Sequence, residues 1–214
     1  MGTAKMVGNV ADVWAGNDLV VTAESGLRVS VFNAYNGMNP VLIAQVPTPG
    51  VPQRVAVSGN YLAVAAGEAG LLIIDLSTPA EARIVNQLRF GNVTMVVASD
   101  GIAYVGQTVG TLKAVELTSG RVLGQTTPPG PLRDLALAGD HLYARTDDQL
   151  FVLSLAEGGL AVTGSANGGP AQVNARLFVG GGTAWSVDRG SYDTFDVSDP
   201  AQPRFLATAS ASFF

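Results

Sequence analysis

A repeat of about forty residues runs through the chain and constrains its fold more than any other feature. Its first landmark is a tight turn rich in Gly, Asn and Asp, and successive turns are 43, 41, 39 and 42 residues apart. These turns are centred on Gly16, Gly59, Asp100, Gly139 and Gly181. A second landmark, a short apolar segment, follows each turn by roughly fifteen residues. Because two independent landmarks keep one period, the chain is a tandem array of five similar units.

Each unit contains four short apolar segments separated by turn residues, which is typical of a four-stranded antiparallel meander. In the second unit these segments are 54–57, 61–65, 71–76 and 83–87. Several of them are almost continuously apolar, which indicates a sheet buried on both faces. Such sheets cannot stand alone in water, and stacking them around an axis buries both faces.

The sequence therefore predicts an all-β fold, a β-propeller of five four-stranded antiparallel blades forming a single domain over 1–214. The expected blades are approximately 9–50, 51–92, 93–130, 131–170 and 171–213. The alternative is that these blades are part of a larger ring of six to eight blades, or of a ring completed by a second subunit.

Composition excludes several classes of protein. The net charge of −5 gives no basic footprint for DNA or RNA, and the absence of cysteine excludes disulfides and thiolate metal sites. No apolar run is long enough to span a bilayer. The start of the chain, 1–7, lacks the apolar core of a signal peptide, so we expect none in this chain.

Two stretches, 58–85 and 182–208, closely resemble LVIVD repeats. They share a Gly-Asn or Gly-Gly turn, an apolar strand, a strand that ends in Asp (Asp75 or Asp196), and a following Ser-containing turn. The third and fourth units are more degenerate, since Glu116 and Ser154 occupy the Asp position. The resemblance implies a propeller blade, usually in secreted, periplasmic or cell-surface proteins of prokaryotes.

Aligning the units places charged residues at one end of the sheets. Ala11, Arg54, Met95, Asp134 and Arg176 fall at equivalent positions near the start of the first strand. The turns between the second and third strands lie at the same end and also carry carboxylates. We therefore predict a ligand site at the channel mouth, because arginine forks suit carboxylate or phosphate groups. Its candidate residues are Arg54, Arg133, Asp134, Arg176, Glu68 and Asp148. The alternative is that these charges solvate loops and pair with one another.

Other candidate chemistry is sparse. His141 is the sole histidine and cannot form a His-rich metal site alone. The oxygen ligands of Asp196 and Asp199 could hold calcium, although Ser198-Asp199-Pro200 is explained more simply as a turn. No nucleophile-elbow, P-loop or zinc-protease motif occurs. We expect no cofactor and no metal.

Three functions remain open. The first is a non-enzymatic binding or scaffold module that presents a ring face to a protein or glycan partner. The second is a hydrolase that uses the arginines and carboxylates of the channel mouth. The third is a structural subunit that self-associates through the exposed edges and apolar faces of its first and last blades.

Overall fold

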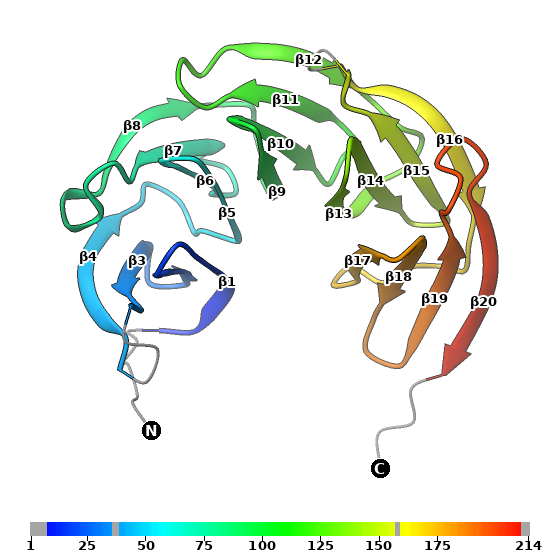
Figure 1. Cartoon of the computed structure of the whole chain (residues 1–214), viewed down its shortest axis with the longest axis horizontal. Helices are drawn as coiled ribbons and strands as arrows, with labels where there is room; N and C mark the ends of the chain where they lie inside the picture. The colour runs from blue at the N-terminus through cyan, green and yellow to red at the C-terminus, as the bar shows by residue number, and fades with distance from the viewer. Residues whose placement is uncertain (1–7, 36–38, 157–158, 211–214) are drawn as a thin grey trace. The chain divides into compact units, whose positions relative to one another are not determined.

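The computed structural model describes residues 8–35, 39–156 and 159–210. The N-terminal segment 1–7, in which we expected no signal peptide, lies outside them. The described chain folds into five four-stranded antiparallel sheets, and in each sheet the strands lie side by side in chain order (Figure 1). The predicted all-β fold of five four-stranded propeller blades is confirmed.

The first two sheets share one design. The first comprises β1 (Val10–Gly16), β2 (Leu19–Glu24), β3 (Arg28–Asn33) and β4 (Val41–Pro47). The second comprises β5 (Arg54–Ser58), β6 (Tyr61–Ala65), β7 (Leu71–Asp75) and β8 (Arg83–Leu88), with a short 3-10 turn η1 (Pro79–Glu81) before β8.

The other three sheets repeat the meander. The third comprises β9 (Val93–Ser99), β10 (Ile102–Gln107), β11 (Leu112–Glu116) and β12 (Val122–Thr126). The fourth comprises β13 (Leu132–Ala138), β14 (His141–Thr146), β15 (Gln149–Ser154) and β16 (Ala161–Asn167). The fifth comprises β17 (Arg176–Gly180), β18 (Thr183–Val187), β19 (Ser191–Asp196) and β20 (Arg204–Ser210).

The chain divides into two compact units. One spans 1–105 and 115–121, and contains the first and second sheets together with β9. The other spans 106–114 and 122–214, and contains the fourth and fifth sheets together with β12. Closure of the five sheets into one ring, and their status as a single domain, stay predictions. No helix in the described residues is long and apolar enough to cross a membrane.

The turns that marked the repeat join the first and second strands of each sheet. Two-residue hairpins of this kind need backbone in the left-handed region, which Gly, Asn and Asp tolerate best. Asn17 has φ 50° and Asp18 has φ 58°, while Gly59 has φ 58° in the second sheet. The conformation that the turn demands therefore explains why these residue types recur with the period of the repeat.

The second sheet is buried on both faces. Leu62, Val64, Leu72 and Ile74 pack in a cluster with Val21 and Val29 of the first sheet, among others. Alternate residues of the same strands, such as Ala63 and Ile73, pack instead with β9 and β10. Since successive side chains point to opposite faces of a strand, the continuous apolar runs of β6 and β7 supply both cores.

Within each compact unit, a hydrogen bond links one sheet to the next. The two residues that it joins are one repeat apart in the sequence. Asp12 Oδ2 accepts a bond of 3.0 Å from the Val55 backbone N–H, and Asp134 Oδ2 accepts one of 2.9 Å from that of Leu177. Each bond spans 43 residues. A carboxylate at the start of one sheet thus holds the first strand of the next.

The ties also correct the alignment in the first sheet, where Ala11 was expected at the position of Arg54. The register pairs Asp12 with Ala23, just as it pairs Arg54 with Ala65. The two turn residues of the first hairpin are Asn17 and Asp18, whereas those of the second are Gly59 and Asn60, so Gly16 corresponds to Ser58 and the equivalence shifts by one.

Candidate functional site

A cavity of about 560 Å³ lies at one end of the second sheet. Its wall comes from the segment leading into β5, the turn between β6 and β7, and the segment leaving β8. It is lined by Pro49, Gly50, Val51, Gln53, Ala66, Gly67, Glu68, Ala69, Gln87, Arg89 and Asn92. Hydrogen-bonding side chains thus gather around an opening whose floor is made of small residues.

The floor of this cavity is held by backbone contacts. Gly67 has φ 58° and exchanges two hydrogen bonds with Val93, of 2.9 Å and 3.0 Å. The Gln87 amide donates a bond of 2.9 Å to the Ala69 carbonyl oxygen, which fixes the turn against β8. A side chain at Gly50 would collide with the carbonyl oxygen of Ala66, so the two walls meet backbone to backbone. The cavity is therefore preorganised by the sheet.

Two side chains of opposite charge at the cavity have no polar partner within the described residues. Glu68 and Arg89 are both exposed, and neither makes a hydrogen bond or ion pair through its side chain within the described residues. Gln53 and Asn92 add two amides, each with both donors and an acceptor. The lining, all of it described, contains no hydroxyl, thiol or imidazole. Its one carboxylate is that of Glu68.

Of the residues predicted from sequence, Glu68 lies in this lining. Arg54 begins β5, directly after the lining residue Gln53. The Nη1 atom of Arg54 donates a hydrogen bond of 3.2 Å to the Gln53 carbonyl oxygen. Both belong to the first compact unit, whereas Arg133, Asp134, Asp148 and Arg176 belong to the second.

In the second unit three of the four predicted residues have side-chain partners within the protein, and Asp148 is held through its backbone. Arg176 forms an ion pair of 3.2 Å with Asp134, which is buried and also accepts the inter-sheet hydrogen bond described above. Arg133 pairs with Asp147, and the carbonyl oxygen of Asp148 accepts a bond of 2.7 Å from the Gly168 backbone N–H. These contacts stabilise the fold, and a role of the four residues in ligand binding stays a prediction.

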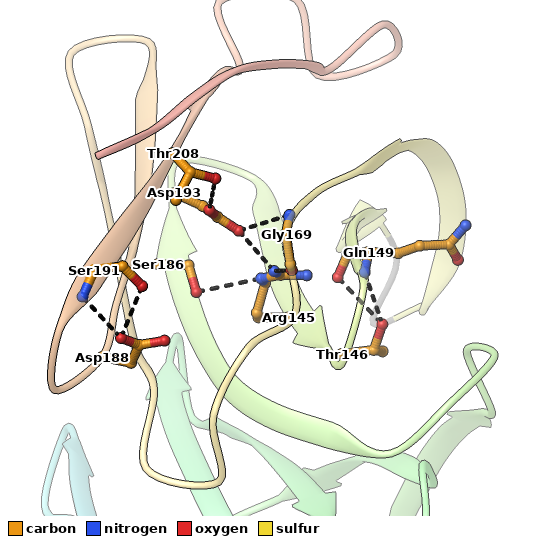
Figure 2. A network of polar contacts seen from close by, with 9 residues as sticks. All are labelled: Arg145, Thr146, Gln149, Gly169, Ser186, Asp188, Ser191, Asp193 and Thr208. Carbon is orange, nitrogen blue, oxygen red and sulfur yellow. Dashed lines mark hydrogen bonds and ion pairs between the residues drawn. The ribbon is translucent and has the colours of Figure 1, made fainter. Parts of the chain in front are cut away.

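Sequence reasoning missed a buried ionic network between the fourth and fifth sheets (Figure 2). The side chain of Arg145 is 0% exposed, and its Nη2 donates to Asp193 Oδ2 at 2.9 Å. Nη2 also donates to the Gly169 carbonyl oxygen, and Nε donates to Ser186 Oγ at 3.2 Å. Burial lowers the pKa of Arg145, and the charge of Asp193 opposes that shift.

The carboxylate of this network is fully engaged. Asp193 accepts further bonds from the Gly169 backbone N–H at 2.9 Å and from Thr208 Oγ1 at 2.6 Å (Figure 2). The guanidinium of Arg145 also lies 5.5 Å from the centre of the Phe195 ring.

One signal of this network was available in the sequence, because Arg145 interrupts the apolar strand β14. The residues Arg89 and Asn92 were missed since they lie in a connecting segment without a motif.

The segment considered for calcium forms a turn. Asp196 Oδ1 accepts bonds from the Ser198 backbone N–H at 3.0 Å and from Ser198 Oγ at 2.6 Å. Asp199 Oδ1 accepts a bond of 3.0 Å from the Ala201 backbone N–H. Among the described residues, no three acidic or histidine side chains are grouped to hold a metal ion. His141 begins β14 beside Tyr143, with ring centres 6.5 Å apart.

Comparison with solved structures agrees with this architecture. The crystal structure of the computationally designed Ika8 protein is similar, with a TM-score of 0.71 over 94% of this chain, at 13% sequence identity. The chain spans 61% of the length of that protein. Five four-stranded sheets with inter-sheet ties define a protein of the β-propeller class.

The repeat itself has a family. Residues 49–87 match the LVIVD repeat, so the resemblance noted in the sequence is confirmed for this segment. This segment contains the second sheet except for the last residue of β8, and most of the cavity lining. None of the curated proteins compared with the chain matches it.

Proposed function

We propose that the protein is a non-enzymatic binding module and that the cavity of the second sheet is its binding site. The observation that carries this proposal is Arg89, an exposed guanidinium that lines the cavity and has no partner within the described residues. Guanidinium groups bind carboxylates through paired hydrogen bonds. Glu68 is the one carboxylate of the lining, whereas glycoside hydrolysis uses a pair of carboxylates, which favours binding over the hydrolase alternative.

The ligand that fits this lining is an oligosaccharide that carries carboxylates. A sugar acid supplies the anion for Arg89, and its hydroxyl groups both donate and accept hydrogen bonds, as the amides of Gln53 and Asn92 do. The same hydroxyls donate to Glu68. An acidic peptide or a phosphate polymer would set its own negative charges against Glu68, and so fits less well.

Calorimetric titration tests this proposal. Trigalacturonate should bind, while its methyl ester should bind at least tenfold more weakly because it lacks the anion. Arg89→Ala should weaken binding at this cavity by about 10- to 100-fold, the usual range for a lost hydrogen bond to a charged group.

The matched control is Arg83→Ala, which removes an exposed arginine at the other end of the same sheet and should leave binding unchanged. Equal binding of the ester, or tighter binding of triglutamate than of the sugar acid, would contradict the choice of ligand. The secreted, periplasmic or surface location implied by the repeat family belongs to the same proposal, and fractionation of the producing cells tests it.

Self-association is a second candidate, supported by apolar side chains on the outer strands. In β20, Phe205 is 40% and Leu206 57% exposed, and in β4 Val41 is 59% exposed. Exposed apolar edge strands favour pairing with another chain. Light scattering over a concentration series should then show growth that Leu206→Lys abolishes, and a constant monomer mass would rule the assembly out.

A further inference from the structure

The fifth sheet carries a second cavity, of about 400 Å³. It is lined by Gln172, Val173, Asn174, Asp188, Arg189, Gly190 and Ser191. These residues come from the segment leading into β17 and from the turn between β18 and β19. The cavity of the second sheet is built from the corresponding segments, before β5 and between β6 and β7, and in addition from the segment leaving β8, which supplies Arg89 and Asn92.

The strand registers show that the two positions are equivalent. Arg54 pairs with Ala65 immediately before the turn that lines the first cavity. Arg176 pairs with Val187 immediately before the turn that lines the second. Each cavity is thus formed where the segment entering the first strand passes the turn between the second and third strands.

The second cavity also has similar chemistry. Arg189 is exposed and makes no hydrogen bond or ion pair through its side chain within the described residues. Gln172 and Asn174 supply two amides, as Gln53 and Asn92 do in the second sheet. An unpartnered arginine, a glutamine and an asparagine thus line both cavities, but Arg89 and Asn92 follow β8, whereas Arg189 lies in the turn after β18.

The turn beneath Arg189 is held in one conformation by Asp188. Its Oδ1 accepts bonds of 3.0 Å from both the backbone N–H and the Oγ of Ser191 (Figure 2). It also accepts one of 3.2 Å from the Gly190 backbone N–H. Burial raises the pKa of Asp188, but these bonds outweigh it and leave the pKa below its ordinary value. The carboxylate therefore stays ionised at neutral pH and keeps the turn closed.

We propose that the cavity of the fifth sheet is a second binding site for the same class of ligand, a carboxylate-bearing oligosaccharide, with Arg189 as its anion-binding residue. The choice of ligand rests on the proposed function of the second sheet, whereas the existence of the site rests on the geometry of the fifth. The protein is then bivalent. A smaller adjoining cavity of about 200 Å³, which shares Gln172, Asp188 and Ser191, gives the bound sugar room beyond the anion.

The test is the stoichiometry of trigalacturonate binding to the full chain, measured by calorimetry. We expect two sites in the wild type, one in Arg89→Ala, one in Arg189→Ala and none in the double variant. Arg204→Ala is the matched control, because it removes an exposed arginine at the other end of the fifth sheet, opposite Asp196 in the register of β19 and β20. This variant should retain two sites. Unchanged thermal melting shows that each variant is folded.

The outcomes separate the two proposals. One site that Arg89→Ala removes and Arg189→Ala spares would overturn the second site and leave the proposed function standing. One site with the opposite response would overturn the site in the second sheet and support the one in the fifth. No binding to the wild type would overturn the ligand for both, and two sites that survive Arg189→Ala would overturn the role of Arg189.

Discussion

Replacing Asp193 by alanine should lower the free energy of unfolding by about 3–5 kcal/mol, the usual cost of leaving one member of a buried ion pair without its partner. The structure places the expected loss of stability at the upper end of this range. The Arg145 side chain is 0% exposed, so its charge would be left buried without its counter-ion. The substitution also removes the acceptor for the Gly169 backbone N–H and for Thr208 Oγ1.

For a chain of this size, about 2–4 °C of Tm is lost per kcal/mol, so Tm should fall by about 6–20 °C. Urea unfolding followed by tryptophan fluorescence measures the change, since Trp185 lies in β18, the strand that pairs with the strand of Asp193. The control is Arg83→Ala, whose arginine is 63% exposed and whose ion pair should contribute less than about 1 kcal/mol.

A double replacement separates the buried charge from simple loss of packing. Arg145→Met with Asp193→Leu removes both charges, and should recover most of the stability that the single Asp193→Ala variant loses. A loss below about 1 kcal/mol in the single variant, or a double variant as unstable as the single one, would refute the account of the network as a coupled buried pair.

Three further predictions concern the ties and turns. Asp12→Ala should cost about 1–3 kcal/mol and speed hydrogen exchange at the Val55 amide, which loses its acceptor; unchanged exchange there would contradict the tie. Gly70→Ala should cost at least about 1 kcal/mol in urea unfolding, because φ is 84° and the new methyl group meets a carbonyl oxygen of β8. Hydrogen bonds from the side chain and backbone of Ser198 lower the pKa of Asp196, so Ser198→Ala should raise it in a carboxyl NMR titration. The stability from that depressed pKa is present above the ordinary value of about 3.9 and is lost as pH falls through the folded-state pKa.

The fold could be predicted because its signals are local and repeat. The left-handed turns at Asn17 and Gly59 restrict the residue type directly, and the apolar runs of β6 and β7 report burial on both faces. The one-residue shift at Asp12 left no such signal, since both hairpins contain a Gly-Asn pair, but Gly16 ends a strand in the first whereas Gly59 lies in the turn of the second.

The site was harder to predict because the same charges can bind a ligand or each other. Asp134 and Arg176 are equivalent positions in successive repeats, which suggested a shared surface, but the sheets bring them into mutual contact. Arg89 and Arg189 lie in connecting segments, where sequence gives no measure of whether a side chain finds a partner. That distinction depends on packing between repeats and becomes visible only in three dimensions.

The carboxylate of Asp12 and that of Asp134 each reach forward to the following repeat, so the connector is encoded in the repeat that precedes the junction. A gene duplication that copies such a repeat in frame would also copy the aspartate that bonds to the next repeat. A longer array therefore needs no new contact between repeats. In-frame duplication or deletion is thus a simple route by which chains of this kind gain or lose blades.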